Sequence, residues 1–223
     1  MSPLPPPEAR IVLRPLGNPL PLGFMALAGA TTVVAALQLE WLPAAQGDMV
    51  ALILLAFVAP LQLVSSVLGY LARDAIAGTG MGLLAGTWAS VGLVLRAGPP
   101  GSDSEALGVL LLVAAAGMAV VAVSAVAGKL AAVAVLGTTA VRFALTGMDQ
   151  LTASALWRDS SAIVGLVLAA VAVYAALAFL LEDVQRATRL PLGRRGAGRA
   201  SMDEGVSARL DRIEHEAGVR EQL

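Results

Sequence analysis

The stretch Gly17-Asn18-Pro19-Leu20-Pro21-Leu22-Gly23-Phe24 marks the point where a proline-rich start gives way to an apolar run. Proline fixes φ and lacks an amide N–H, so Pro19 and Pro21 are excluded from a helix interior, and the residue before a proline avoids helical geometry. The run from Leu22 to Val34 is nevertheless apolar enough to enter a membrane. We therefore predict an extended plug that turns into the first membrane-spanning helix, with Pro21 near its first turn.

The composition is that of a protein embedded in a lipid bilayer. The chain has 223 residues, of which 57% are hydrophobic and 14% are charged, whereas soluble domains carry about 25% charged residues. No charge occurs between Met49 and Ala72, and about 20 apolar residues suffice to span a membrane. A soluble core would have to contain several such windows at once, so we reject it. The net charge of −1 argues against a nucleic-acid partner.

Hydropathy predicts an all-α membrane protein with six transmembrane helices in a compact bundle. The predicted spans are Leu22–Leu42, Met49–Leu71, Thr79–Leu95, Ala106–Ala127, Leu130–Gly147 and Ser161–Leu181. Short connections make consecutive helices antiparallel neighbours. We predict a disordered lead over residues 1–15, the transmembrane domain over 16–181 and a cytoplasmic tail over 182–223. Within the tail, residues 201–223 form either a short amphipathic helix or a disordered end.

Small residues dominate the predicted spans. Gly82 and Gly86 form a G-x-x-x-G pattern in the third span. Small side chains let helix backbones approach closely, so this pattern is typical of tight packing, either within one subunit or between subunits. A general richness in alanine is the alternative explanation.

Lysines and arginines near the span ends predict the orientation of the chain. Nine of them lie on one side of the predicted membrane, and only Arg96 and Arg158 lie on the other. Cytoplasmic loops are enriched in these residues, so both termini are placed in the cytoplasm. An even number of spans also requires the two termini to share a side. The predicted location is the inner membrane of the cell, with multiple crossings.

The fifth predicted span carries the most informative polar residues. Arg142 recurs with Thr139 and Asp149 at helical spacing, which places the three on one face. An arginine at mid-helix costs roughly 2.5–3.5 kcal/mol on insertion scales. Three interpretations stay open: an ion pair inside the bundle, with Asp149 or an acid of another helix; a residue that attracts anions into a pathway; and a side chain that snorkels to the interface.

Other polar residues in the spans are weaker indicators. Thr31 and Thr32 are expected to hydrogen-bond back to carbonyls of their own helix. Trp88 lies among hydroxyl groups in the third span and is either a packing residue or part of a constriction. The polar residues of the second span are expected to bond across helices: Gln62, Ser65 and Ser66.

The sequence shows none of the patterns of an enzyme. It has no P-loop, no spacing of metal ligands, no nucleophile–base pair and no cysteine. We therefore expect no catalytic residue, no metal and no cofactor.

Two motifs make the chain resemble the acetate uptake transporter family, which includes the bacterial succinate–acetate permeases. The family opens with Asn-Pro-x-Pro-Leu-Gly shortly before its first span. Here this motif is Asn18-Pro19-Leu20-Pro21-Leu22-Gly23, followed by Phe24-Met25-Ala26-Leu27 and then Thr31-Thr32. At the other end, Tyr174 is followed at family-like spacing by Leu190-Pro191-Leu192-Gly193. The resemblance extends from Leu16 to Gly193.

The resemblance implies a six-helix protomer with its own pathway, assembled as a homo-hexameric ring. It also implies transport of small monocarboxylates such as acetate, and in some members succinate, linked to protons. In the family the proline-rich opening lies beside the pathway, and side chains of the first, third and fifth spans narrow it near the midplane. The corresponding positions here are Leu27, the Trp88–Ala89 region and Thr139.

The chain departs from the family pattern at positions that would set selectivity. The third-span Tyr-Gly pattern is absent, and Ala77-Gly78-Thr79-Gly80-Met81 replaces the Gly-Asn-Thr-Phe before that span. Asp149-Gln150 stands where Gly-Asn often follows the gate, and Phe179 stands where a glutamate is usual in the last span. Arg142 appears one turn past the gate position.

The sequence thus predicts a transporter or channel-like permease for a small carboxylate, with acetate as the first candidate. In this hypothesis Asn18 and the free amides around Pro19 and Pro21 form an anion vestibule. The alternatives are a pore for a neutral solute (urea, ammonia, acetic acid or water) and a transport-inactive scaffold that acts through its tail. The residues assigned to the pathway are Asn18, Pro19, Pro21, Leu27, Thr31, Trp88, Thr139, Arg142 and Asp149.

Overall fold

The structure is a computed structural model that describes residues 16–185 and 189–194. The predicted lead over residues 1–15 and the predicted amphipathic segment over residues 201–223 lie outside the described residues. Every regular element in the described part is helical.

Six helical spans are long and apolar enough to cross a membrane, which confirms the predicted all-α fold class. The second span is built from three consecutive helical pieces, preceded by the short 3-10 turn η1 (Ala44–Gln46). The spans are α1 (Leu20–Gln38), α2 (Gly47–Ile53) with η2 (Leu54–Val58) and α3 (Ala59–Leu71), α4 (Ala75–Ala97), α5 (Glu105–Ala125), α6 (Leu130–Thr152) and α7 (Ala155–Gln185).

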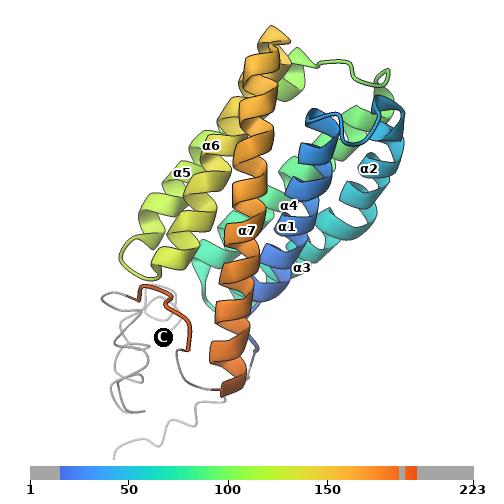
Figure 1. The fold of residues 1–223 in the computed structure, drawn as a ribbon. Coiled ribbons are helices and arrows are strands. Elements are labelled where there is room, and N and C mark those ends of the chain that lie inside the picture. Colours follow the sequence, from blue (N-terminus) through green and yellow to red (C-terminus); the bar gives the residue numbers. More distant parts are fainter. Residues whose placement is uncertain (1–15, 186–188, 195–223) are drawn as a thin grey trace, which may run out of the picture.

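The helices pack mainly as three pairs, which are α1 with α7, α3 with α4, and α5 with α6 (Figure 1). The start of α1 and the end of α7 lie at the same end of the bundle, as an even number of crossings requires. We name this end the Lys129 end, because Lys129 lies in the turn between α5 and α6. We name the opposite end the Arg158 end, where α7 begins.

The second span contains a π-turn, η2, that hydropathy does not reveal. Pro60 follows directly, in the first turn of α3. A proline has no amide N–H, and its ring clashes with the carbonyl of the preceding turn. The wider π-turn accommodates this interruption without breaking the span.

The proline-rich start of α1 is shorter and more helical than predicted. The helix begins at Leu20, two residues before the predicted start, and Pro19 already has helical angles (φ −79°, ψ −17°). Pro21 lies in the first turn, as predicted. The Leu20 amide donates to the side-chain oxygen of Asn18 at 3.1 Å. The extended plug is therefore limited to the residues before Pro19.

Polar side chains of α3 fix this start against the bundle. Ser65 Oγ donates to the Pro19 carbonyl at 2.7 Å, and Gln62 Nε2 donates to the Gly23 carbonyl at 3.5 Å. Ser66 Oγ donates to the carbonyl of Gly78 in α4 at 2.6 Å. The prediction that the second span bonds across helices is therefore confirmed.

A short strap after α7, residues 190–194, covers the start of α6. The amides of Leu130 and Ala131 donate to the carbonyls of Gly193 and Leu192, at 3.2 and 3.1 Å. These are first-turn amides that have no partner within their own helix. Tyr174 Oη donates to the Pro191 carbonyl at 3.0 Å, so α7 holds the strap in place. Tyr174 and the segment 190–193, the two parts of the second family motif, therefore both stabilise the start of α6.

Glycines set the closest helix approaches. A Cβ on Gly69 of α3 would lie 2.7 Å from the amide nitrogen of Gly78 in α4. A Cβ on Gly147 of α6 would lie 3.0 Å from the Gly108 carbonyl in α5. In the G-x-x-x-G pattern only Gly82 approaches a neighbour, because a Cβ on Gly86 would meet nothing within 4 Å.

We expect Gly69→Ala to destabilise the protein by about 1–3 kcal/mol, the usual cost of overpacking, because its methyl group meets backbone atoms that cannot turn aside. Gly137→Ala is the matched control, since a Cβ there meets nothing within 4 Å. The measurement is the thermal unfolding midpoint in detergent. Equal midpoints for the two variants would contradict the close α3–α4 contact.

Candidate functional site

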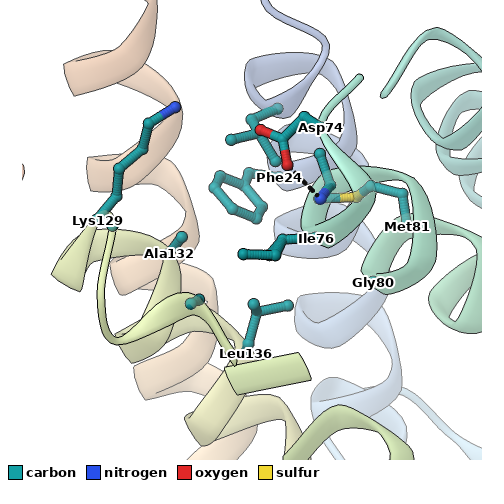
Figure 2. Close-up of a pocket in the computed structure, with 12 residues that line it drawn as sticks. Phe24, Asp74, Ile76, Gly80, Met81, Lys129, Ala132 and Leu136 are labelled. Carbon is teal, nitrogen blue, oxygen red and sulfur yellow. Dashed lines mark hydrogen bonds between the residues drawn. The ribbon is translucent and has the colours of Figure 1, made fainter. Parts of the chain in front are cut away.

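A cavity of about 190 Å³ lies at the Lys129 end, between α1, α4, the α5–α6 turn and α6. Figure 2 shows Lys129 and Asp74 on opposite sides of this cavity, with the apolar side chains of Phe24 and Ile76 between them. Lys129 and Asp74 are the only charged residues of the lining. The lining residues are Leu20, Phe24, Asp74, Ile76, Ala77, Gly80, Met81, Ala125, Gly128, Lys129, Ala132 and Leu136.

Further charged groups lie near Lys129 at this end of the bundle. Lys129 Nζ lies 5.2 Å from the ring centroid of Phe179 in α7, within cation–π range. Glu182, only 7% exposed, forms an ion pair with Arg194 of the strap. Burial lowers the pKa of Lys129; the charges of Asp74 and Glu182 oppose this shift, and that of Arg194 adds to it. The cavity is thus lined by Lys129, whose charged form is disfavoured by burial.

The structure revises what the sequence indicated at this end of α7. The helix continues to Gln185, beyond the predicted end of the span at Leu181. Phe179 occupies the position where the family glutamate is usual, yet a buried carboxylate is present three residues later at Glu182. Glu182 could have been recognised because it continues the buried face that contains Ala175, Ala178 and Phe179.

Two backbone groups of the proline motif, where an anion vestibule is predicted, already have partners within the protein. The Leu20 amide is already bonded to Asn18, and the Pro19 carbonyl accepts from Ser65. From this region of α1 the cavity is lined by Leu20 and Phe24, and Asn18, Pro19 and Pro21 are not among its lining residues. The motif therefore fixes the start of α1 beside the cavity, and the Leu20 amide is not free to bind an anion.

The bundle is filled beyond the cavity. The next turns of the same helices carry Leu27 in α1, Leu84 in α4 and Thr139 in α6, all fully buried. Trp88, 2% exposed, packs edge-to-face on Phe143 with ring centroids 5.7 Å apart. Thr139 Oγ1 donates to the Val135 carbonyl of its own helix at 2.8 Å. The three positions of the expected constriction (Leu27, Trp88 and Thr139) are thus all interior.

Arg142 is the charged residue most deeply enclosed in the described chain, with 1% of it exposed. Its Nη1 donates to the Thr31 carbonyl at 3.0 Å and its Nη2 to Gln38 Oε1 at 3.4 Å, both in α1. Its guanidinium carbon lies 5.8 Å from the ring centroid of Trp88 in α4. The ion pair with Asp149 is not formed in the described structure, nor does Arg142 snorkel to an interface.

Two neighbours from other helices make room for this guanidinium. A Cβ on Gly165 of α7 would collide with Arg142 Nη1 and Cζ, so the guanidinium lies directly against the α7 backbone. Thr31 Oγ1 donates to the Gly165 carbonyl at 3.0 Å, which corrects the expectation that Thr31 bonds within its own helix. Thr32 does so, to Ala28 at 2.7 Å. Arg142 therefore joins α6 to α1 and α7 at one point.

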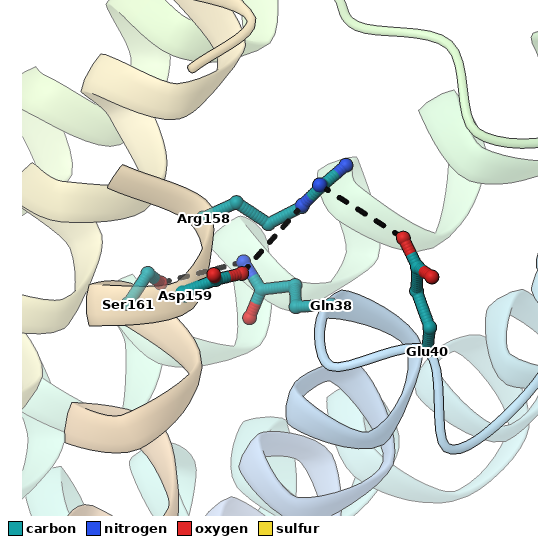
Figure 3. Close-up of polar contacts among 5 residues, drawn as sticks. All are labelled: Gln38, Glu40, Arg158, Asp159 and Ser161. Carbon is teal, nitrogen blue, oxygen red and sulfur yellow. Dashed lines mark hydrogen bonds and ion pairs between the residues drawn. The ribbon is translucent and has the colours of Figure 1, made fainter. Parts of the chain in front are cut away.

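A chain of polar side chains connects Arg142 with the Arg158 end. Gln38 Nε2 donates to Ser161 Oγ at 3.4 Å, and Ser161 Oγ lies 2.5 Å from Thr146 Oγ1. Figure 3 shows Gln38 and Ser161 beneath the ion pairs of Arg158 with Glu40 and Asp159, each at 3.9 Å. These outer pairs are exposed and contribute little to stability. Asp149, 6% exposed, lies two turns from Arg142 on α6.

Six apolar helical spans around this buried polar centre define the chain as a multi-pass membrane protein. The sequence profile of the GPR1/FUN34/yaaH family matches residues 2–192, and the chain belongs to this family. No curated protein matches the chain. A solved structure described as "Structure of the bacterial acetate channel SatP" shares the fold, with a TM-score of 0.72, 20% sequence identity and coverage of 80% of this chain and 100% of that chain. The resemblance inferred from the two motifs is thereby confirmed.

We expect Arg142 and Gly165 to be strongly coupled in stability. Gly165→Ala alone should lower the unfolding midpoint, because its methyl group displaces the guanidinium. In an Arg142→Leu background the same change should be nearly neutral, giving a coupling energy of about 1 kcal/mol or more in a double-mutant cycle. Additive effects would show that the guanidinium does not lie against Gly165.

Proposed function

We propose that the chain is a channel or permease for small monocarboxylates, acetate first, with one pathway in each protomer. The pathway runs from the cavity at the Lys129 end, along α1, α4 and α6 past Leu27 and Trp88, to the polar chain at the Arg158 end. The described structure then corresponds to a closed state, since the middle of this route is filled by side chains.

The observation that carries this proposal is the apolar cavity with a lysine at its mouth and a buried arginine beyond its inner end. Acetate has a methyl group and a carboxylate, so it suits a route that is apolar along its walls and cationic at two points. Family membership and the shared fold with an acetate channel support the same substrate class.

We further propose a homo-hexamer in the inner membrane with both termini in the cytoplasm. The described Lys129 end carries Arg73, Lys129, Arg189 and Arg194, whereas the other end carries Arg96 and Arg158. This asymmetry supports cytoplasmic termini. Exposed apolar side chains cover the outside of α5 and α7, for example Val113 and Ile163, and such faces suit lipid or neighbouring subunits.

A neutral solute such as acetic acid is the second candidate, and the cavity lining favours it. Ten of the twelve lining residues are uncharged and without polar side chains. Acetic acid would pass such a wall without the desolvation cost of an anion. In that case the proton would travel with the acetate, and no net charge would cross.

We expect liposomes containing the purified chain to take up radiolabelled acetate in a saturable manner, above the level of empty liposomes. The measurement is made with an imposed proton gradient and, separately, with an imposed membrane potential. Uptake that follows the potential supports anion passage, and uptake that follows only the proton gradient supports acetic acid or proton-linked transport. No uptake by folded protein would contradict the proposal.

We expect Lys129→Gln to slow acetate uptake several-fold at low ionic strength, and less at high salt because the Debye length shortens. Burial lowers the pKa of Lys129, so as the pH rises into the alkaline range its charge is lost earlier than that of an ordinary lysine, whose pKa is about 10.4. The faster acetate uptake of the wild type relative to Lys129→Gln should therefore disappear at alkaline pH.

The measurement for this prediction is uptake at equal pH on both sides of the membrane, followed upward from neutral pH. Lys129→Arg is the matched control, because it keeps its charge throughout and should show no alkaline loss. A wild-type advantage that is independent of pH would show that the charge of Lys129 does not act on the solute.

A further inference from the structure

Arg142 is a buried cation without an anion. In the described part of the chain no carboxylate lies within ion-pair distance of it. It has two hydrogen bonds, one of them long at 3.4 Å, although a guanidinium offers five donors. Both acceptors, the Thr31 carbonyl and the Gln38 amide oxygen, are neutral. No carboxylate therefore balances this positive charge, and only neutral acceptors and the Trp88 ring lie beside it.

Trp88 carries a buried donor without an acceptor. Its side chain is 2% exposed, and its indole Nε1 has no hydrogen-bond partner. Buried donors are almost always paired, so each exception calls for an explanation. The Trp88 ring lies 5.8 Å from the guanidinium carbon of Arg142. A buried cation without a carboxylate partner and an indole N–H without an acceptor thus occur within one small region of the interior.

This region lies on the proposed pathway. Arg142 is six residues beyond Leu136, the innermost α6 residue of the cavity lining, which is about 9 Å along the helix. Thr31 is one turn beyond Leu27 on α1, and Trp88 is one turn beyond Leu84 on α4. Gln38 links the region to Ser161 and the Arg158 end. A solute that crosses the filled section must pass these side chains.

We propose that Arg142 and Trp88 form the binding site of a single small carboxylate in the closed section of the pathway. The substrate class in this inference rests on the proposed function. The carboxylate accepts two parallel hydrogen bonds from the guanidinium, a geometry that a chloride ion or a neutral solute cannot match. It replaces the long contact between Arg142 and Gln38 Oε1, while the shorter bond to the Thr31 carbonyl continues to orient the guanidinium.

The test uses the fluorescence of Trp88 in the full-length protein in detergent. Trp41→Phe and Trp157→Phe leave Trp88 as the only tryptophan. Sodium acetate is titrated against sodium chloride at constant ionic strength. We expect a saturable change of emission with acetate but not with chloride. Arg142→Gln should raise the acetate concentration at half-saturation at least about tenfold, because a charged hydrogen bond is lost. Arg142→Lys should retain part of the affinity for acetate.

The matched control is Arg96→Gln, an exposed arginine at the end of the helix that carries Trp88; it should bind acetate as wild type does. If Trp88 does not respond to acetate in protein that transports it, the inferred site is overturned and the proposed function stands. A lower unfolding midpoint for Arg142→Gln with unchanged half-saturation also overturns the inferred site, because Arg142 would then be only a structural tie. If Arg142→Gln does not fold, the comparison of acetate with chloride in wild type and Arg142→Lys decides.

Discussion

The burial of one guanidinium constrains the centre of this bundle. A charge held away from water requires acceptors and space, and different helices of the bundle supply them. Thr31 of α1 supplies a carbonyl, Gly165 of α7 supplies space by having no side chain, and Trp88 of α4 supplies an aromatic face. The carbonyl can serve Arg142 as well as its own helix because it has two lone pairs. The rotation of four helices about their axes is thereby tied to Arg142.

The proline motif at the start of α1 has a related role at the Lys129 end. Ser65 and Gln62 of α3 hold the carbonyls of Pro19 and Gly23, and Asn18 closes on the Leu20 amide. The first amides of a helix have no partner inside it, and in lipid they must be satisfied by protein, as Asn18 does for Leu20. The motif is therefore better explained as the docking site of α1 on α3 than as a site for anions.

Hydropathy was sufficient to predict the six spans, because each apolar window must cross the bilayer whatever its neighbours are. It could not predict the partners of Arg142, since Thr31 and Gln38 lie more than 100 residues away in sequence. Asp149, two turns along the same helix, was the local candidate and proved wrong. Pro60 and Glu182 can be read from the sequence, but the π-turn η2 before Pro60 and the ion pair of Glu182 with Arg194 of the strap are known only from the folded structure.

An apolar wall favours an apolar solute, whereas a fixed cation favours an anion. A small organic acid has both an apolar part and a carboxylate, so it suits both. The cavity wall of Phe24, Ile76 and Met81 offers no hydrogen bonds to a strongly hydrated ion. The guanidinium beyond it offers little to a neutral solute. A short-chain carboxylate loses less by desolvation at its methyl end and regains charge compensation at its carboxylate end. A solute that is inverted or too long would place its carboxylate against apolar side chains, so this arrangement selects for length as well as for charge.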